Sequence, residues 1–144
     1  MTDIDIKLTT EQDLLVLNEL DHIARDDSSR QSFIEDATRT QRAWTIEDSK
    51  EIVGYGIISH EFFGRSFLEL IYIDESKRSK GYGPELISFL EMQSKSVDLF
   101  TSTNESNSHM QHVLEKLGYE RSGIIHNLDV GDPEIVYVKK GVCT

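Results

Sequence analysis

The chain has 144 residues, of which 38% are hydrophobic and 28% are charged, and its formal net charge is −11. This length and composition predict one compact domain, residues 1–144, with a buried core. The acidic balance opposes binding to nucleic acids and favours cationic partners such as amines and basic peptides, although an acidic surface can also serve only solubility.

The sequence shows no signal for a membrane, a targeting segment or a metal. No segment approaches the roughly 18 apolar residues of a membrane span, and acidic and polar residues follow Met1. The only cysteine is Cys143, and the five histidines are scattered without the spacing of metal ligands, so each is interpreted as structural or solvent-exposed. We therefore expect a cytoplasmic protein with no membrane contact and no bound metal.

The first half of the chain predicts a strand, two helices and three strands. Alternating apolar residues indicate the strands, and a cap at Thr9 or Thr10 and another at Ser28 or Ser29 begin the helices. In chain order these are a strand at 4–8, helices ending near 20 and near 40, and strands at 43–47, 52–59 and 67–73. Short turns between the last three strands indicate an antiparallel meander. The almost continuously apolar run 67–73 predicts a central strand covered on both faces.

The second half predicts two amphipathic helices and three strands. Apolar residues recur at helical spacing between 86 and 90 and again between 110 and 117, where Gly118 ends the helix. The strands are expected at 99–101, 119–125 and 135–138. A strand, a helix and a strand in succession imply a parallel pair, so the fold class is mixed α/β.

A glycine-rich turn lies between the apolar run and the next helix. Its residues are Arg78, Ser79, Lys80, Gly81, Tyr82 and Gly83, and Pro84 follows where the first helical position is expected. A helix start offers unpaired N–H groups and a positive dipole end, the glycines let the backbone approach an anion, and two residues add positive charge. The turn therefore predicts a phosphate site, with a plain strand-to-helix turn as the alternative.

Two common nucleotide motifs do not fit this turn. A Walker motif requires a Lys-Ser/Thr pair after the second glycine, and a Rossmann motif requires a third glycine where Leu86 stands. The turn does match in full the Arg/Gln-x-x-Gly-x-Gly/Ala signature of the GNAT superfamily of acyl-CoA-dependent N-acetyltransferases. The chain resembles this family at that position.

A second pattern of the family, Asn-x-x-Ala-x-x-Leu-Tyr-x-x-x-Gly-Phe, is matched in part. It is matched in register by Asn107, Val113, Gly118 and Tyr119, whereas Met110 replaces its alanine and Leu114 its tyrosine. The predicted order of elements is also that of the family over essentially the whole chain. The resemblance implies a mixed, mostly antiparallel central sheet of about seven strands, flanked by four helices, with a splayed parallel pair formed by the fourth and fifth strands.

The function implied by the resemblance is N-acetylation. Such an enzyme transfers an acetyl group from acetyl-CoA to a primary amine of a small molecule, a peptide or a protein by direct attack on the thioester. A non-catalytic acyl-CoA-binding regulatory module is the alternative, because Leu114 cannot donate a proton as the replaced tyrosine would. The acceptor, the acyl chain and the oligomeric state stay open, a homodimer being one option.

The resemblance also implies which residues contact acetyl-CoA. The pantetheine arm would pair with the backbone of Ile71 and Ile73, as any amide-bearing ligand can pair with a strand edge. The turn residues Arg78 to Gly83 would hold the pyrophosphate, and Asn107 would help to hold the arm.

The chemistry needs a base for the amine and a donor for the oxyanion. Glu69 is the candidate base, because desolvation inside an apolar strand raises the pKa of a carboxyl group; a carboxylate without catalytic duty is the alternative, and Glu61 is the second choice. A backbone N–H near Tyr72 and Ile73 would meet the oxyanion. A bound water, Ser106, Ser108 or His109 would protonate the thiolate.

Three carboxylates, Asp129, Asp132 and Glu134, lie in a turn-rich loop between the last two strands. In the family this loop borders the acceptor site, so the three are predicted to receive a cationic acceptor. A solvated hairpin loop is the alternative. Asp26 and Asp27, between the first two helices, are also candidates to receive a cationic acceptor, again with a solvated loop as the alternative.

Overall fold

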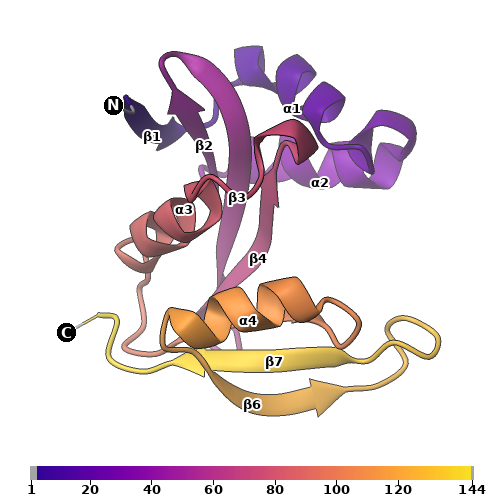
Figure 1. Cartoon of the computed structure of the whole chain (residues 1–144), viewed down its shortest axis with the longest axis vertical. Coiled ribbons are helices and arrows are strands. Elements are labelled where there is room, and N and C mark those ends of the chain that lie inside the picture. Colours follow the sequence, from indigo (N-terminus) through magenta and orange to yellow (C-terminus); the bar gives the residue numbers. More distant parts are fainter. Residues whose placement is uncertain (1–2, 144) are drawn as a thin grey trace. The chain divides into compact units, whose positions relative to one another are not determined.

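The computed structural model describes residues 3–143, whose strands form a seven-stranded sheet in the order β1-β2-β3-β4-β5-β7-β6 (Figure 1). The strands are β1 (Ile4–Leu8), β2 (Ala43–Asp48), β3 (Glu51–Phe62), β4 (Arg65–Ile73), β5 (Leu99–Asn104), β6 (Glu120–Ile125) and β7 (Glu134–Lys139). The α-helices of the described residues are α1 (Leu14–Leu20), α2 (Ser28–Arg39), α3 (Tyr82–Glu91) and α4 (Ser108–Lys116). β4 and β5 are parallel, so the predicted fold class is confirmed.

The chain divides into two compact units. Unit 1 comprises Met1–Ile58 and Leu70–Leu90, and unit 2 comprises Ser59–Glu69 and Glu91–Thr144. β3 and β4 each contribute residues to both units.

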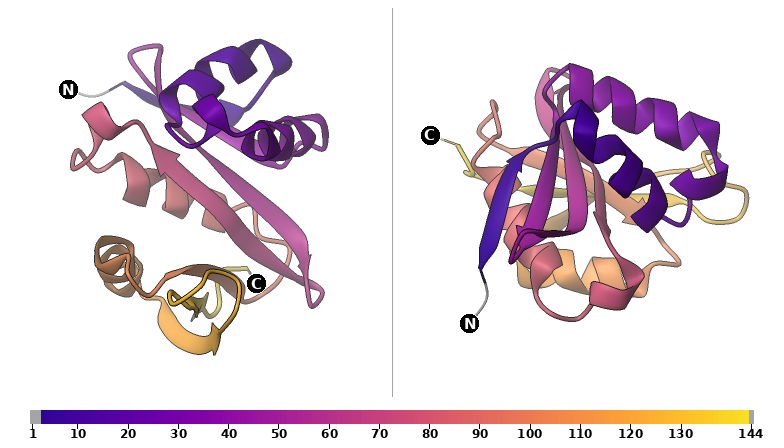
Figure 2. Two further views of the ribbon diagram at one scale, coloured as in Figure 1. Left: turned by 90° about the vertical axis from the view of Figure 1, so that its right-hand side faces the viewer. Right: turned by 90° about the horizontal axis from the view of Figure 1, so that it is seen from above.

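In unit 1, helices cover both faces of the sheet (Figure 2). Tyr55 of β3 points to one face, where it packs in a buried cluster with Leu17 of α1 and Ile34 of α2. Gly56 points to the other face, where a Cβ on this residue would lie 2.7 Å from Cδ1 of Leu90 in α3. Because successive residues of a strand face opposite sides, α1 and α2 lie on one face and α3 on the other.

The strand β4 differs from its prediction in length and in burial. It begins at Arg65 rather than at 67, and its burial alternates: Leu68 and Tyr72 are buried, whereas Glu69 is exposed. The expectation of a strand covered on both faces is therefore wrong at Glu69.

The first predicted helix is also divided. A capping box at Thr10 starts it, with the backbone N–H of Thr10 donating to the Asp13 carboxylate at 2.9 Å. The first turn is a 3-10 turn, Glu11–Asp13, and the α-helix proper covers Leu14–Leu20.

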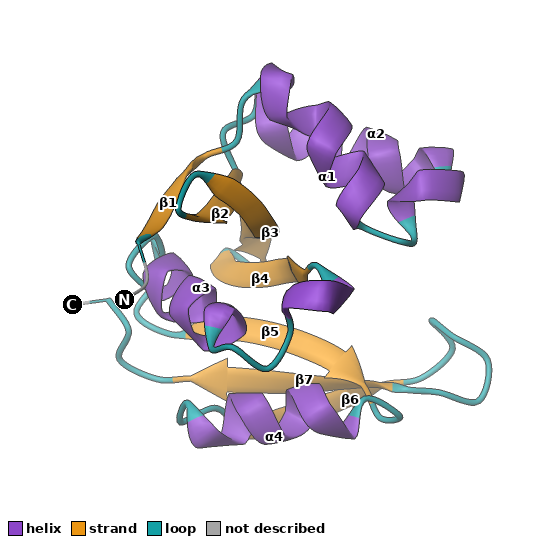
Figure 3. Cartoon of the chain, turned by 45° about the horizontal axis from the view of Figure 1, so that its top comes forward, coloured by secondary structure: helices purple, strands orange, loops and turns teal. Residues whose placement is uncertain are grey.

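In unit 2, α4 lies along the strands β5, β7 and β6 (Figure 3). β5 pairs antiparallel with β7 over its whole length, from Leu99↔Lys139 to Asn104↔Glu134. Its parallel pairing with β4 covers only three residue pairs, from Ser66↔Leu99 to Leu68↔Thr101. β6 is the edge strand, and all six of its residues are exposed. No helix within residues 3–143 is both long and apolar enough to cross a membrane.

Candidate functional site

The predicted phosphate turn lies in unit 1, between the end of β4 and α3. Helix α3 begins at Tyr82, two residues before the expected position of Pro84, so Tyr82 and Gly83 belong to its first turn. The first backbone hydrogen bond of the helix runs from the N–H of Glu85 to the carbonyl of Gly81 at 3.2 Å. The N–H groups that precede Glu85 therefore have no carbonyl partner within the helix, as an anion site requires.

The two glycines of the turn serve different purposes. Gly81 has a φ of 88°, in the left-handed region that strains residues with a side chain. Gly83 has no such φ, and a Cβ added to it would have no neighbouring atom within 4 Å. The fold therefore does not require glycine at 83, and the open space above it fits the approach of a ligand oxygen to the helix start.

Arg78 folds back onto β4. Its Nε donates a hydrogen bond to the carbonyl of Ile73 at 2.9 Å, and its guanidinium carbon lies 5.1 Å from the centre of the Tyr72 ring. Ser79 and Lys80 are exposed, and Ser79 has a positive φ of 64°. The turn thus presents backbone and one lysine outward, while Arg78 fixes the end of the strand.

Tyr82 anchors the turn to the hairpin between β2 and β3. Its hydroxyl donates a hydrogen bond to the carboxylate of Asp48, and this bond raises the pKa of Tyr82 while lowering that of Asp48. Nearby, Nζ of Lys77 lies 2.7 Å from the carboxylate of Glu51. Since the side chain of Tyr82 is used in this way, its backbone N–H is the group that remains for a ligand.

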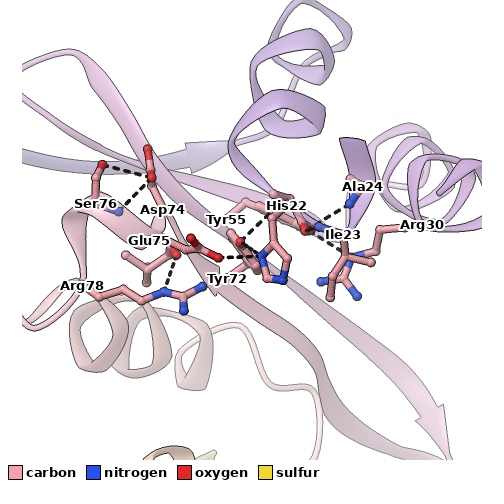
Figure 4. Close-up of polar contacts among 12 residues, drawn as sticks. His22, Ile23, Ala24, Arg30, Tyr55, Tyr72, Asp74, Glu75, Ser76 and Arg78 are labelled. Atoms are coloured by element: carbon pink, nitrogen blue, oxygen red, sulfur yellow. Dashed lines mark hydrogen bonds and ion pairs between the residues drawn. The ribbon is translucent and has the colours of Figure 1, made fainter. Parts of the chain in front are cut away.

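Tyr72 stands between the two residues predicted to pair with pantetheine. Its side chain is 6% exposed, and its hydroxyl accepts a hydrogen bond from the backbone N–H of His22 at 3.1 Å. The same hydroxyl lies 2.5 Å from Nδ1 of His22 (Figure 4). Nδ1 of His22 is also 3.0 Å from Oε1 of Glu75, in the 3-10 turn that follows β4. Sequence reasoning missed His22 and Glu75, because nothing in the local pattern joins two residues so far apart.

A buried carboxylate lies beside this cluster. Asp21 is fully buried and accepts hydrogen bonds from the Tyr55 hydroxyl, from Nε of Arg30 at 3.0 Å and from the N–H of Ile23 at 2.9 Å. Burial alone would raise the pKa of Asp21, but the bond from Tyr55 and the charge of Arg30 outweigh it, and the pKa lies below its ordinary value. This network fixes the segment between α1 and α2, next to His22.

Apart from Asp26 and Asp27, which belong to unit 1, the remaining predicted residues lie in unit 2. Glu69 and Glu61 are both exposed, so the burial that suggested Glu69 as a base is absent. Asn107 caps α4, its Oδ1 accepting a hydrogen bond from the N–H of Met110 at 3.1 Å. Its Nδ2 makes none of the hydrogen bonds found among the described residues. Leu114, at the position of the family's tyrosine, is 2% exposed.

The loop carboxylates are bound to the end of β5. Asp129 accepts from Nδ2 of Asn104 at 2.9 Å, and Glu134 accepts from the hydroxyl of Ser102 at 2.6 Å. Asp132 accepts from both the N–H and the hydroxyl of Ser106, at 3.0 and 2.6 Å. All three therefore hold the loop in place, a use that the sequence did not indicate.

Residues 3–143 contain no group of three or more His, Cys, Asp and Glu side chains that could hold a metal ion. The donors that the geometry offers to a ligand are instead the N–H groups at the start of α3. Together with the open glycine at 83 and the exposed Lys80, they fit a phosphate group.

Comparison with known proteins shows the family and agrees with the fold. Residues 11–119 match the model of the acetyltransferase (GNAT) family. A GNAT-family acetyltransferase from Bacillus cereus ATCC 10987 is 33% identical, with a TM-score of 0.89 over 96% of this chain and 97% of that chain.

More distant structures share the fold alone. The ribosomal-protein-S18-alanine N-acetyltransferase from Escherichia coli is 15% identical, with a TM-score of 0.81 over 99% of this chain and 96% of that chain. A streptothricin acetyltransferase from Bacillus anthracis str. Ames, so described provisionally and solved with acetyl coenzyme A, is 13% identical, with a TM-score of 0.79 over 96% and 98%. With the turn, the fold and the family model in agreement, the chain belongs to the acetyltransferase (GNAT) family, a family of enzymes whose acyl donor is acetyl-CoA.

Proposed function

We propose that the chain acts as one domain, in the cytoplasm, to transfer an acetyl group from acetyl-CoA to a primary amine by direct attack on the thioester. The observation that carries this proposal is the turn before α3, where open space lies over Gly83 at a helix start whose N–H groups have no intrahelical partner. Acetyl-CoA would supply the activated acyl group. The residues of the chain would bind it, orient it and handle the protons.

The proposed contacts to acetyl-CoA use hydrogen-bonding groups that are not occupied by the interactions described above. Backbone N–H groups of Tyr82 and Gly83, with Lys80, would hold the pyrophosphate, and Arg78, Ser79 and Gly81 would shape the turn around it. Backbone groups of Ile71 and Ile73 would pair with the pantetheine arm. The carbonyl of Ile73 already accepts a hydrogen bond from Arg78, so the N–H of Ile73 is the group proposed to bind the pantetheine arm. The amide Nδ2 of Asn107 would donate to the same cofactor.

We propose a cationic acceptor. The net charge of −11 favours the approach of amines in general. The carboxylates Asp129, Asp132 and Glu134 are each bound by a donor from residues 102–106, but a carboxylate has about four acceptor sites and can still receive an ammonium group. Small amines and the amino termini of peptides both meet this description.

At the reacting centre we propose roles for Glu69 and Tyr72. The exposed carboxylate of Glu69, the one acidic residue of β4, would attract the ammonium group of the acceptor. The backbone N–H at Tyr72 would donate to the thioester oxygen, where negative charge develops during the attack.

The test uses Gly83→Leu. A Cβ at this position has no protein atom within 4 Å, and leucine improves helix propensity by several tenths of a kcal/mol, so the thermal midpoint should not fall. Binding of acetyl-CoA, measured by isothermal titration, should weaken at least about tenfold, which is about 1.4 kcal/mol. Gly123→Leu is the matched control, since Gly123 also lacks a positive φ and has no atom within 4 Å of a built Cβ.

Turnover is measured as thiol release from acetyl-CoA with spermidine, benzylamine and a peptide with a free alanine amino terminus. Wild type and Gly123→Leu should release thiol with at least one of these amines. Wild-type affinity for acetyl-CoA in Gly83→Leu would show that the turn is not the cofactor site, and binding without amine-dependent release would favour the regulatory module.

A further inference from the structure

Two groups beside His22, the carboxylate of Glu75 and the hydroxyl of Tyr72, form an arrangement that orients a histidine ring (Figure 4). Nδ1 of His22 lies 3.0 Å from Oε1 of Glu75 and 2.5 Å from the hydroxyl of Tyr72. The backbone N–H of the same residue donates to that hydroxyl at 3.1 Å. His22 is thus held to β4 by its main chain and by its ring at once.

The contacts of Nδ1 with Glu75 and Tyr72 indicate which ring nitrogen is basic. An ionised carboxylate can only accept hydrogen bonds, and the Tyr72 hydroxyl can also accept, so a proton on Nδ1 of the neutral ring is compatible with both contacts. Nε2 then carries the lone pair, and it makes none of the hydrogen bonds or ion pairs found among residues 3–143. The side chain of His22 is 48% exposed, so a ligand has access to it. A carboxylate on one ring nitrogen with a free lone pair on the other is the arrangement that orients a general base.

The position of the ring relates it to the proposed reacting centre. Tyr72, which holds the ring, lies on β4 between Ile71 and Ile73, the residues proposed to pair with the pantetheine arm. All of these residues and Glu75 belong to unit 1, so their arrangement is part of one compact unit. His22 follows α1 directly, and its backbone neighbour Asp21 is fixed by the bonds from Tyr55 and Arg30.

We propose that Nε2 of His22 is the general base that deprotonates the acceptor amine, with Glu75 and Tyr72 as positioning residues. This inference rests on the proposed function. The acceptor enters as an ammonium ion, and Nε2 takes one of its protons. The lone pair set free on nitrogen forms the C–N bond, and the C–S bond breaks with its electron pair on sulfur. A second proton of the amine goes to the thiolate, and the proton on His22 returns to solvent.

The role suits His22 better than Glu69. A general base works best when it changes protonation near the working pH, which histidine does among the side chains in their ordinary state. Glu69 is exposed and belongs to unit 2, and burial no longer supports it as a base. The charged and titratable groups that face His22 are Glu75 and Tyr72, with Arg78 beyond the Tyr72 ring.

The test replaces His22 by Asn, whose amide nitrogen can stand at the position of Nδ1 and keep the bonds to Glu75 and Tyr72 but has no counterpart of Nε2. With the probe amine that wild type acetylates fastest among spermidine, benzylamine and the alanine peptide, kcat at neutral pH should fall by about 100-fold or more. The KM for acetyl-CoA should change less than twofold. The acidic limb of the wild-type pH–rate profile should disappear, and the rate should rise with pH as the free amine becomes available.

Two further variants separate the base from its supports. Glu75→Gln keeps a hydrogen-bonding group but loses the charge, and it should shift the acidic limb of the profile while lowering kcat less than His22→Asn does. Added imidazole should restore part of the activity of His22→Asn, a result that a purely structural role would not give. His112→Gln, at an exposed histidine of α4, is the matched control and should have wild-type rates.

The outcomes are distinct. A wild-type protein that binds acetyl-CoA but acetylates none of the probe amines would overturn the proposed function and this inference with it. A wild-type protein that turns over while His22→Asn keeps its rate and its acidic limb would overturn this inference alone. If His22→Asn lowers the thermal midpoint so far that it cannot be assayed, an unshifted profile in Glu75→Gln overturns the inference instead.

Discussion

At the scale of single residues, the segment between α1 and α2 is held by one buried carboxylate. Asp21 is fully buried and is bound by Tyr55, by Arg30 and by two backbone N–H groups. Without the carboxylate of Asp21, the positive charge of Arg30 would lose its partner, although the Arg30 side chain is only 20% exposed. Removing one partner of a buried pair typically costs more than the pair itself contributes.

We therefore predict that Asp21→Asn lowers the free energy of unfolding by about 2–4 kcal/mol at neutral pH. The folded-state pKa of Asp21 lies below its ordinary value, so its contribution is fully present above that ordinary value and is lost as the pH falls through the folded-state pKa. Urea unfolding of wild type should lose stability below about pH 4, and Asp21→Asn should show a smaller loss over the same range.

Asp36→Asn is the control for this series. Asp36 is an exposed carboxylate of α2 that pairs with Arg39 at 3.3 Å and with Arg42 at 3.2 Å. Exposed pairs contribute little, so this variant should stay within about 1 kcal/mol of wild type. If Asp21→Asn lost as much stability at low pH as wild type does, Asp21 would not be a source of the acid sensitivity.

The left-handed glycine of the turn gives a second prediction at this scale. Gly81→Val places a β-branched residue at a φ of 88° and should cost about 1–2 kcal/mol of stability. It should also weaken acetyl-CoA binding at least about tenfold, because relaxing the strain moves the backbone that faces the phosphate.

Gly64→Val separates strain from binding. Gly64, in the turn between β3 and β4, has a φ of 78° and no atom within 4 Å of a built Cβ, as Gly81 does. Thermal melts should show a similar loss of stability in both variants, whereas titration should show wild-type affinity for acetyl-CoA in Gly64→Val. Equal affinities in the two variants would mean that the phosphate binds elsewhere.

The residues of the candidate site could be predicted from the sequence only where they are close together in the sequence. Arg78 to Gly83 lie side by side in sequence, so their glycine and charge pattern could be recognised directly. His22 and Glu75 are brought together by folding, across more than fifty positions, and neither has a local pattern that marks it. Glu69 was misjudged because apolar neighbours in sequence suggested burial, whereas the residue itself is exposed.

At the scale of elements, periodicity predicted which segments are helices and strands but not how their ends form. β1 and α2 lie where they were expected, although the cap of α2 is Asp27 rather than Ser28 or Ser29. β3 extends to Phe62, beyond the expected end at 59, since pairing with a neighbouring strand can lengthen a strand past its apolar run. The division of the first helix at Leu14 likewise follows from the capping box rather than from periodicity.

Close approach between elements explains the two glycines of β3. A Cβ on Gly54 would lie 2.5 Å from the carbonyl oxygen of Tyr72, and this backbone atom can move away only at a substantial cost in free energy. A Cβ on Gly56 would meet the tip of the Leu90 side chain at 2.7 Å, which can rotate. We predict that Gly54→Ala lowers the free energy of unfolding by about 2–3 kcal/mol and Gly56→Ala by about 1 kcal/mol. Urea unfolding checks the order, and a reversed order would contradict it.

The cap of α4 allows the proposed cofactor contact of Asn107 to be tested separately from its structural role. Asn107→Ala loses the bond to the N–H of Met110 and should cost about 1 kcal/mol of stability. Asn107→Asp keeps an acceptor for this N–H, so its thermal midpoint should match wild type, but it lacks the Nδ2 donor. The KM for acetyl-CoA should rise in both variants. A wild-type KM in Asn107→Asp would remove Asn107 from the cofactor contacts.

At the scale of the whole molecule, the net charge of −11 acts on both substrates in opposite directions. It attracts a cationic amine and repels the anionic acetyl-CoA, whose phosphates therefore depend on short-range donors at the turn before α3. Long-range attraction is screened by salt, whereas hydrogen bonds at contact distance are screened much less. Varying the ionic strength therefore distinguishes the long-range effect of the net charge from the short-range contacts at the site.

We predict that kcat/KM for spermidine, measured at saturating acetyl-CoA, falls several-fold as ionic strength rises from about 0.01 M to about 1 M, over which the Debye length shrinks from about 30 Å to about 3 Å. For an alanine peptide that carries equal positive and negative charge, the same change should have little effect, because the summed field exerts no net pull on it. Both acceptors are compared at the same pH and at the same series of ionic strengths, so that any effect of salt on the protein itself is common to both. If both acceptors respond alike, the acidity of the chain plays no part in choosing its acceptor, and the choice must lie with contacts at the site itself.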